Sequence, residues 1–462
     1  MKIAIVLGTR PEIIKMASVI DEISSRGHEL VLIHTGQHYD HEMSDQFFEE
    51  LELPIPDYNI GVGSGSHGEQ TGRMMDGIEK VLKDDKVDIL LVQGDTNAVL
   101  AGALVASKLH IPVGHVESGL RSYDNTMPEE INRKAADVCS MFYFVPTEQS
   151  AINLSLEGIS RDQIYITGNT IVDACFRNLE IAKKNLNMSE VLTNENIQDS
   201  INKNIQVSAN ENINDLINLD NILTLTMHRA ENVDNRQRMI DVVNALSELR
   251  DLNIIFPIHP RTKKQLQEFG LYEKLRDLNH IHIIKPLGYL DFLLLLSKSL
   301  LILTDSGGLQ EEAITLNIPA LTLRYNTERP ETVTAGGNIL LGCEKENIVK
   351  TANKILNDND FYSKMASAQN PYGDGTSGKQ ILDIIERGFE LETLNIQAPD
   401  DIMNSFLTKM TRVTEEITVS EFENKNNTVV RIVYSEKKDK MMFPFDDLKL
   451  NGRYVLFDKI LS

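Results

Sequence analysis

The stretch KIAIVLGTRPEIIKMASVIDEIS, residues 2–24, contains the first signal of the fold class. It begins with a short apolar, β-branched run, which is typical of a buried parallel strand. Gly8 then opens a turn, and Pro11 stands where a helix would start, a position at which its missing N–H is tolerated. A strand followed at once by a helix indicates a βαβ unit, so these residues predict an α/β fold.

The same alternation of strand-like and helical segments continues along the chain. In the first half, the strand-like runs are 28–36, 87–96 and 141–147, and helical stretches follow the last two. In the second half, the rhythm restarts with strand-like runs at 221–228, 253–259, 280–289, 300–308 and 318–324. The pattern predicts two Rossmann-like, doubly wound parallel sheets. A ligand would lie in the cleft between them, beyond the carboxyl ends of the strands.

Two regions interrupt this rhythm. Asn accounts for 11 of the 38 residues at 184–221, which indicates a surface insertion. Random drift in a loop that tolerates substitution would explain this high Asn content as well as a function would. After Thr393, strand-like runs at 417–422, 428–435 and 453–461 predict a small β-rich extension over residues 394–462, and the sequence leaves its role open.

The composition excludes some classes of function. A net charge of −22 argues against a general nucleic-acid-binding protein, because phosphate backbones select for Lys and Arg. The longest apolar run, at 292–304, contains Lys298 and is too short for a membrane span, and the N-terminus lacks a signal-peptide pattern. Three distant cysteines without CxxC spacing suit a reducing compartment and argue against disulfides and structural zinc. We therefore expect a cytoplasmic protein that binds neither nucleic acid nor a membrane.

Residues 370–381, NPYGDGTSGKQI, look at first like a phosphate-binding loop. They spell G-x-x-x-x-G-K from Gly373 to Lys379, but Gln380 stands where that motif needs the Ser or Thr that holds Mg²⁺. No strand-like run leads into them either. The pattern therefore does not predict a nucleotide site at this place.

The end of the first strand is a better candidate for a phosphate site. Gly8, Arg10 and Lys15 surround the strand-to-helix turn, where free amides and two cations would suit a phosphate. An ordinary surface ion pair would also explain Arg10, so this segment does not decide the function alone.

The segment TDSGGLQEEA, residues 304–313, gives a sharper signal. An apolar strand ends there, and Ser306, Gly307 and Gly308 turn tightly into a helix. Ser306 can donate to a phosphate oxygen, and the two glycines let a ligand approach the backbone closely. A helix capped by Ser explains Ser306 without a ligand, but it does not explain both glycines.

Acidic residues and one histidine gather at the predicted edge of the cleft. Asp95 follows a strand, the loop at 114–133 carries Glu117 and Glu129, and His228 ends the first strand of the second half. Carboxylates at strand ends fit general acid–base catalysis, and a His beside a phosphate fits assistance to a leaving group. A lone carboxylate would more often cap a helix, but three carboxylates and a His favour an active site.

Taken in order, these motifs resemble one family, the non-hydrolysing UDP-N-acetylglucosamine 2-epimerases. The resemblance covers about residues 1–390 and implies a fold of the glycosyltransferase-B type. It implies an N-terminal domain at 1–172, completed by a C-terminal helix at about 376–392, and a UDP-binding domain at 173–375 with the insertion at about 185–221. The motifs that carry it are GTRPEIIKMA, TGQHYD, QGDTNAVLAGALVA, PVGHVESGLRSYDNTMPEEINR, TGNTIVDA, MHRAEN, TDSGGLQEEA, TERPETVTAGGNILLG and NPYGDG.

The resemblance also implies where a UDP-sugar would bind. Phe292 would lie against uracil, and Glu312 would hold the ribose hydroxyls. The residues that would surround UDP are Ser306, Gly307, Gly308 and Arg329. The residues that match active-site positions are Arg10, Lys15, Asp95, Glu117, Glu129, Arg133 and His228. NPYGDG is then a family hallmark, and a homodimer is expected because the family is commonly dimeric.

The chemistry that the resemblance implies explains why such groups are needed. No carbonyl acidifies the C2 proton of UDP-N-acetylglucosamine, so UDP leaves C1 while C2 loses its proton, which gives 2-acetamidoglucal. UDP then adds back while a proton arrives on the opposite face, and the product is UDP-N-acetylmannosamine. Two faces imply two acid–base groups among Asp95, Glu117 and Glu129, whose individual roles stay open. Neither NAD nor a metal is required.

Three other functions fit part of the pattern. A hydrolysing epimerase would release N-acetylmannosamine and UDP. A retaining glycosyltransferase on the same fold would need an acceptor and typically a basic or amphipathic membrane-facing patch, which does not stand out in this acidic chain. A non-catalytic sugar-nucleotide sensor would not need the acidic residues and His228.

Overall fold

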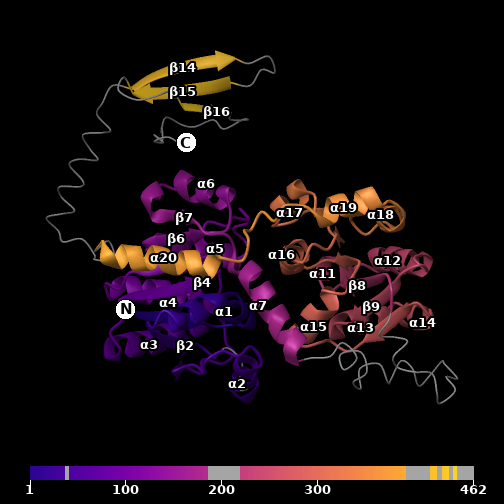
Figure 1. Ribbon diagram of the computed structural model, residues 1–462, viewed down its shortest axis with the longest axis horizontal. Coiled ribbons are helices and arrows are strands. Elements are labelled where there is room, and N and C mark those ends of the chain that lie inside the picture. The colour runs from indigo at the N-terminus through magenta and orange to yellow at the C-terminus, as the bar shows by residue number, and fades with distance from the viewer. Residues whose placement is uncertain (37–40, 186–218, 392–416, 424–428, 436–440, 445–462) are drawn as a thin grey trace.

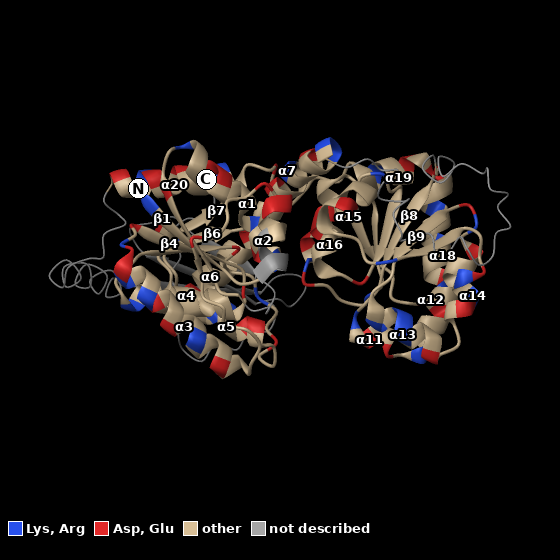
Figure 2. Cartoon of the chain, turned by 90° about the horizontal axis from the view of Figure 1, so that it is seen from below, with Lys and Arg blue, Asp and Glu red and all other residues tan. Residues whose placement is uncertain are grey.

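The structure is a computed structural model of the 462-residue chain, and it describes residues 1–36, 41–185, 219–391, 417–423, 429–435 and 441–444. It shows two α/β halves, each built on its own sheet, with helix α7 (Thr170–Asn185) between them (Figure 1). Acidic and basic residues are interspersed over the outer helices (Figure 2). Within the described ranges, no helix is long and apolar enough to cross a membrane.

The first half is a parallel sheet of seven strands in the order β3-β2-β1-β4-β5-β6-β7. Its winding reverses between β1 (Lys2–Leu7) and β4 (Ile89–Gln93), and doubly wound sheets bind their ligands at such a reversal. The other strands are β2 (Glu29–His34), β3 (Tyr58–Asn59), β5 (Val113–Val116), β6 (Phe142–Val145) and β7 (Ile164–Ile166). The helices are α1 (Arg10–Ser25), α2 (His41–Glu50), α3 (His67–Asp84), α4 (Asn97–Lys108), α5 (Pro128–Cys139) and α6 (Glu148–Leu156).

The second half is a parallel sheet of six strands in the order β10-β9-β8-β11-β12-β13. Its winding reverses between β8 (Ile222–Thr226) and β11 (Leu301–Thr304). The other strands are β9 (Asn253–Pro257), β10 (Ile281–Ile284), β12 (Ala320–Thr322) and β13 (Asn338–Leu340). The helices are α11 (Ala230–Val233), α12 (Arg236–Glu248), α13 (Pro260–Glu268), α14 (Tyr272–Arg276), α15 (Tyr289–Leu296), α16 (Gly307–Thr315), α17 (Pro330–Ala335), α18 (Lys345–Asn357) and α19 (Asn359–Ala366).

Helix α20 (Ser377–Glu390) follows the second half in the chain but packs on the first (Figure 1). Its apolar face, which includes Ile381 and Ile385, is buried in the same core as the apolar residues of α1. Asp173 on α7 accepts hydrogen bonds from the N–H groups of Ser377 and Gly378 at 3.2 and 2.8 Å. These bonds satisfy two of the free donors at the start of α20, so the returning helix is anchored at its first turn.

The segment NPYGDG forms the bend that leads into α20. Asn169 donates its N–H to the Tyr372 carbonyl at 2.8 Å, so the bend is fastened to the start of α7. Gly168 has a φ of +79°, and a Cβ there would lie 2.5 Å from the Tyr372 carbonyl oxygen. The glycine is therefore required for close backbone contact within the fold.

The structure adds to and corrects several sequence-based expectations. Four strands, β3, β5, β7 and β13, were not predicted, because runs of two to four residues give little periodic signal. Gly307 and Gly308 are the first residues of α16, not part of a turn before it. Most of the Asn-rich insertion, residues 186–218, lies outside the described residues.

The extension contains an antiparallel sheet of β14 (Ile417–Glu423), β15 (Val429–Ser435) and β16 (Met441–Pro444). The first two strands confirm the β-rich prediction. The third was not predicted, and the strand-like run at 453–461 lies outside the described residues.

Candidate active site

A cavity of about 430 Å³ lies between the two halves, a volume typical of ligand pockets. From the first half, its wall includes Lys15 on α1 and Ile171 on α7. It lies at the carboxyl edge of the strands, where doubly wound folds bind their ligands. The other predicted site residues in this wall are His228, Phe292, Ser306, Gly308, Glu312 and Arg329.

A buried carboxylate holds the turn between β1 and α1. Glu12 accepts hydrogen bonds from the N–H groups of Gly8 and Thr9 at 2.7 and 2.5 Å and from the Thr96 hydroxyl at 2.6 Å. A side chain at position 8 would not fit, because its Cβ would lie 2.8 Å from Cβ of Ala98. Burial raises the pKa of Glu12 to about 6, against the effect of its three donors. The capped turn directs α1 at the cavity wall.

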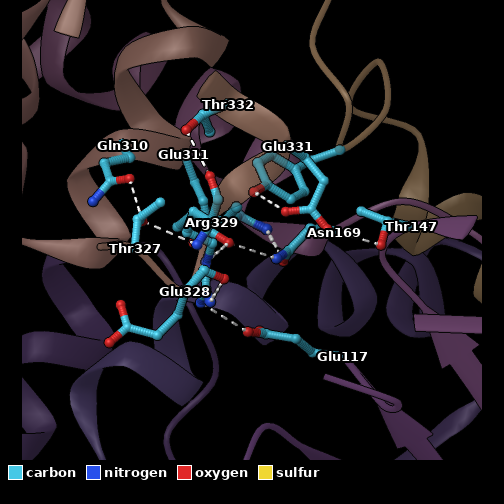
Figure 3. Close-up of polar contacts among 12 residues, drawn as sticks. Glu117, Thr147, Asn169, Gln310, Glu311, Thr327, Glu328, Arg329, Glu331 and Thr332 are labelled. Atoms are coloured by element: carbon cyan, nitrogen blue, oxygen red, sulfur yellow. Dashed lines mark hydrogen bonds and ion pairs between the residues drawn. The ribbon is translucent and has the colours of Figure 1, made fainter. Parts of the chain in front are cut away.

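Two cations and two carboxylates, Lys15, Glu117, Glu311 and Arg329, form a charge cluster beside the cavity. Lys15 Nζ lies 2.5 Å from Glu117 Oε2, which also accepts a hydrogen bond from the Gln93 amide at 2.5 Å. Arg329 Nε donates to Glu311 Oε1 at 2.5 Å, and Arg329 Nη2 lies 3.7 Å from Glu117 Oε1 (Figure 3). The charge cluster therefore joins the two halves, and its formal charges cancel.

The members of the charge cluster shift one another's protonation. Burial by itself would raise the pKa of Glu117, but the Lys15 and Arg329 cations outweigh it and lower the pKa below its ordinary value. Burial also raises the pKa of Glu311, and there Arg329 and Lys15 only partly oppose the effect. Glu117 is thus held ionised and can accept a proton, whereas the ionisation of Glu311 depends on the nearby Arg329 and Lys15 cations.

The backbone of Glu117 is in an unusual conformation. The residue follows β5 directly and has a φ of +65°, a left-handed value that residues with side chains rarely adopt. Its N–H donates to the Phe144 carbonyl at 3.0 Å, which anchors it to the neighbouring strand β6. Such strain persists where the surroundings enforce it, often at functional sites, and here it accompanies the contact with Lys15.

Asp95 and Arg133 form an ion pair beyond the end of β4. Arg133 also donates to Glu130 at 2.6 Å, and this carboxylate is fully buried. Its neighbour Glu129 is exposed in the first turn of α5. Among the described residues, the cavity wall includes none of the three candidate carboxylates Asp95, Glu117 and Glu129, although Glu117 contacts Lys15, which does line it. Their catalytic roles stay predictions.

His228 is oriented by a buried aspartate. The Asp305 carboxylate accepts hydrogen bonds from the N–H groups of His228 and Arg229 at 3.0 and 2.9 Å, and it lies 3.5 Å from His228 Nδ1. Burial lowers the pKa of His228, and Asp305 only partly opposes this. A neutral ring can donate a hydrogen bond from one nitrogen to a ligand in the cavity. The sequence pattern did not assign this role to Asp305.

The first turn of α16 carries the predicted phosphate site. Ser306 is the N-cap residue, and within the described structure its side chain makes no capping hydrogen bond, so its hydroxyl stays free for a ligand. The N-terminus of a helix attracts anions through its free N–H groups and its dipole. Glu312, further along the same helix, has its pKa raised to about 7 by burial.

Two predicted residues have other surroundings. The Arg10 guanidinium is exposed and lies 5.2 Å from the centroid of the Phe47 ring, and Gly307 begins α16 beside the cavity rather than in its described wall. The residues of the site that the sequence did not single out are Gln93, Asn169, Asp305 and Glu311. A polar Gln in the otherwise apolar β4 was a signal for a buried partner.

Comparison with known proteins agrees with this geometry. The sequence model of the family described as UDP-N-acetylglucosamine 2-epimerase matches residues 21–386. The chain belongs to this family. The UDP-N-acetylglucosamine 2-epimerase of Methanocaldococcus jannaschii is 50% identical over 391 residues, which cover 84% of this chain and 100% of that protein. A solved structure of the M. jannaschii enzyme in complex with UDP-GlcNAc and UDP is similar in fold, with a TM-score of 0.68 at 49% identity, over 84% of this chain and 100% of that one.

The family also contains epimerases named for another sugar. The UDP-2,3-diacetamido-2,3-dideoxy-D-glucuronate 2-epimerase of Pseudomonas aeruginosa is 40% identical over 361 residues, which cover 77% of this chain and 92% of that protein. Membership of the UDP-N-acetylglucosamine 2-epimerase family therefore leaves the substituents at C3 and C6 of the sugar to be tested.

Proposed function

We propose that this protein interconverts UDP-N-acetylglucosamine and UDP-N-acetylmannosamine without hydrolysis. The observation that carries the proposal is the Lys15–Glu117 pair, in which a cation of the cavity wall contacts a carboxylate with a lowered pKa. The likeness to relatives named for this substrate supports the choice of sugar.

In the first step, a carboxylate takes the proton from C2 while the bond from C1 to the UDP oxygen breaks. The electrons of the C2–H bond form the C1=C2 double bond, so the products are 2-acetamidoglucal and UDP. Lys15, Arg329 and the free N–H groups at the start of α16 offset the charge of the departing pyrophosphate, and His228 donates a hydrogen bond to it. In the second step, UDP adds back to C1, and C2 receives a proton on the opposite face.

Glu117 is our candidate for one of the two proton transfers, because its pKa is lowered and its side chain adjoins the cavity through Lys15. The second group comes from Asp95, which pairs with Arg133, or from Glu129, which lies in the first turn of α5.

Proton NMR of UDP-N-acetylglucosamine with the enzyme in D₂O tests the proposal. We expect deuterium at C2 of a nucleotide-linked manno product. Retention of the original hydrogen would instead indicate oxidation with internal hydride return. Free N-acetylmannosamine would indicate a hydrolysing epimerase, and sugar transfer that needs an acceptor would indicate a glycosyltransferase. Turnover of UDP-2,3-diacetamido-2,3-dideoxy-D-glucuronate alone would change the proposed substrate but not the reaction.

We further propose that the enzyme is a homodimer in the cytoplasm. The support is the family to which it belongs, and for the compartment also the three cysteines, all of which are free. Light scattering of the purified chain gives the mass and decides the oligomeric state.

A further inference from the structure

The loop after β4, residues Gly94 to Thr96, and Asn97 at the start of α4 are held by side chains from three other elements. The Thr96 hydroxyl donates to Glu12 on α1 at 2.6 Å. Asn132 on α5 donates to the Asp95 carbonyl at 3.0 Å and to the Asn97 side-chain oxygen at 3.1 Å. A loop with so many separate anchors has a defined backbone path, so the place of the Asp95 side chain depends on them.

The third anchor is His115 on β5, which is fully buried. Its Nε2 lies 2.8 Å from the Gly94 carbonyl oxygen, and its Nδ1 lies 2.7 Å from Asp137 Oδ1. The other oxygen of Asp137 accepts a hydrogen bond from Arg121 at 2.7 Å. A backbone carbonyl can only accept, so Nε2 of His115 donates to the Gly94 carbonyl.

His115 thus links the Asp137 carboxylate to the Gly94 carbonyl in the interior. Arg121, which pairs with Asp137, also lies with its Nη2 2.5 Å from Glu157 Oε2. These contacts hold Asp137 in place, so His115 presents a donor to Gly94 in a fixed direction.

The Gly94 carbonyl is the point at which the loop takes its direction. Gly94 has a φ of +83°, so the chain leaves β4 through a left-handed turn. The peptide that joins Gly94 to Asp95 carries this carbonyl, and the hydrogen bond from His115 fixes the plane of that peptide. The sheet does not need the contact for its own pairing, because Gln93 already lies in register with Val116 of β5.

We propose that His115 is a positioning residue, which, anchored by Asp137, fixes the Gly94–Asp95 peptide and thereby the place of the Asp95 carboxylate for proton transfer at the sugar. The inference rests on the proposed function. A positioning role differs from a role in folding, because it predicts a loss of turnover that is independent of substrate binding and of the stability of the fold.

Two substitutions of His115 test the contacts of its two ring nitrogens separately. His115→Asn keeps an amide nitrogen near the position of Nδ1 and loses the donor to Gly94, whereas His115→Gln keeps a donor near the position of Nε2 and weakens the contact with Asp137. We expect kcat of His115→Asn to fall by about 10²-fold, the scale of a 1 Å displacement of a catalytic group, with KM for UDP-N-acetylglucosamine unchanged. His115→Gln should retain most of kcat while losing thermal stability. Equal losses of kcat in both variants, or a rise in KM at constant kcat, would overturn the proposal.

Hydrogen–deuterium exchange of the full chain provides a readout that does not need turnover. Exchange of the amides at 95–97 should rise in His115→Asn and stay near the wild-type rate in His115→Gln. If the wild-type chain does not epimerise UDP-N-acetylglucosamine, the proposed function fails while this exchange experiment still decides whether His115 fixes the loop. If His115→Asn does not fold, Asp137→Asn is the second variant. It keeps the imidazole ring of His115 and removes the carboxylate that anchors this ring. Faster exchange at 95–97 in that variant supports the proposal, and unchanged exchange contradicts it.

Discussion

The Nζ atom of Lys15 lies 2.5 Å from Oε2 of Glu117, and the pair joins the first helix to the end of strand β5 beside the cavity. Lys15 lowers the pKa of Glu117 and so keeps the carboxylate ionised. Under the proposed function, the same cation would also offset the negative charge of a pyrophosphate.

The first prediction concerns pH. Lys15 lowers the pKa of Glu117, so Lys15→Met should raise this pKa, and the acidic limb of kcat/KM should move to higher pH because a base must be deprotonated to act. The measurement is a pH–rate profile from about pH 4 to 8. Lys83→Met, which removes an exposed ion pair far from the cavity, is the matched control. An unmoved limb would show that Glu117 is not the group that titrates in the profile.

Removal of a catalytic carboxylate should affect turnover far more than binding. We expect Glu117→Gln and Asp95→Asn each to lower kcat by about 10²–10⁴-fold, which is the usual loss for a general acid or base. Deuterium incorporation at C2, started separately from each epimer, reports which face each residue serves. A variant that keeps turnover within about threefold of wild type would be removed from the catalytic candidates. Glu129→Gln, measured in parallel, decides between Asp95 and Glu129 as the second group.

Arg329 should be difficult to remove alone. Its guanidinium pairs with buried Glu311, so Arg329→Met leaves that carboxylate with the Asn169 amide at 3.2 Å as its remaining donor. We expect a loss of about 3 kcal/mol in the free energy of unfolding, the scale for breaking a buried pair. Adding Glu311→Gln should restore most of it, because the unpaired charge is then gone. Urea unfolding of both variants tests this, and additive losses would contradict the pairing.

Glu312 should make the protein less stable as pH rises. Burial raises its pKa to about 7 from an ordinary value of 4.5, so between these values the folded state holds a proton that the unfolded state has released. Its contribution to stability is present below about pH 4.5 and is lost as the pH rises through about 7. Glu312→Gln should therefore flatten the decline in Tm over this window. Buried Glu12, with a pKa of about 6, contributes in the same direction and should leave a residual slope. A slope unchanged by Glu312→Gln would contradict the assignment.

The extension after α20 should affect assembly rather than chemistry. The three strands that the structure describes in the extension are too few to bury a stable core of their own, so we expect them to dock on the enzyme body or on a second subunit. Truncation should be made after Leu391, because α20 runs to Glu390 and Gly388 is buried within it. Loss of the dimer with turnover kept would support this. An equally stable dimer would refute it, and a selective loss of turnover would show that the extension reaches the active site.

Long apolar runs made most of the fold predictable. Strands such as β1 and β4 are buried on both faces, and their sequences show it directly. Strand β5, Val113–Val116, carries Gly114 and His115, and its polar residue is tolerated only because Asp137, distant in sequence, lies beside it. A single sequence does not reveal such a partner, so the strand and the role of its histidine were missed together.

The site was predictable where a motif fixes a position relative to a strand end. His228 and Ser306 both follow apolar strands directly, and both line the cavity. The sequence did not indicate which of two adjacent acidic residues is buried. Glu129 and Glu130 differ only in the face of α5 on which they stand, and the structure buries Glu130 and exposes Glu129. Which face is covered depends on neighbouring elements, not on the local sequence.

The return of α20 to the first half has a consequence for biosynthesis. Domains usually fold as they emerge from the ribosome, N-terminal parts first. Here the surface of α1 against which α20 packs stays uncovered until about residue 390 has been synthesised. The nascent first half therefore exposes this surface of α1 to chaperones and to other chains while the whole second half is translated.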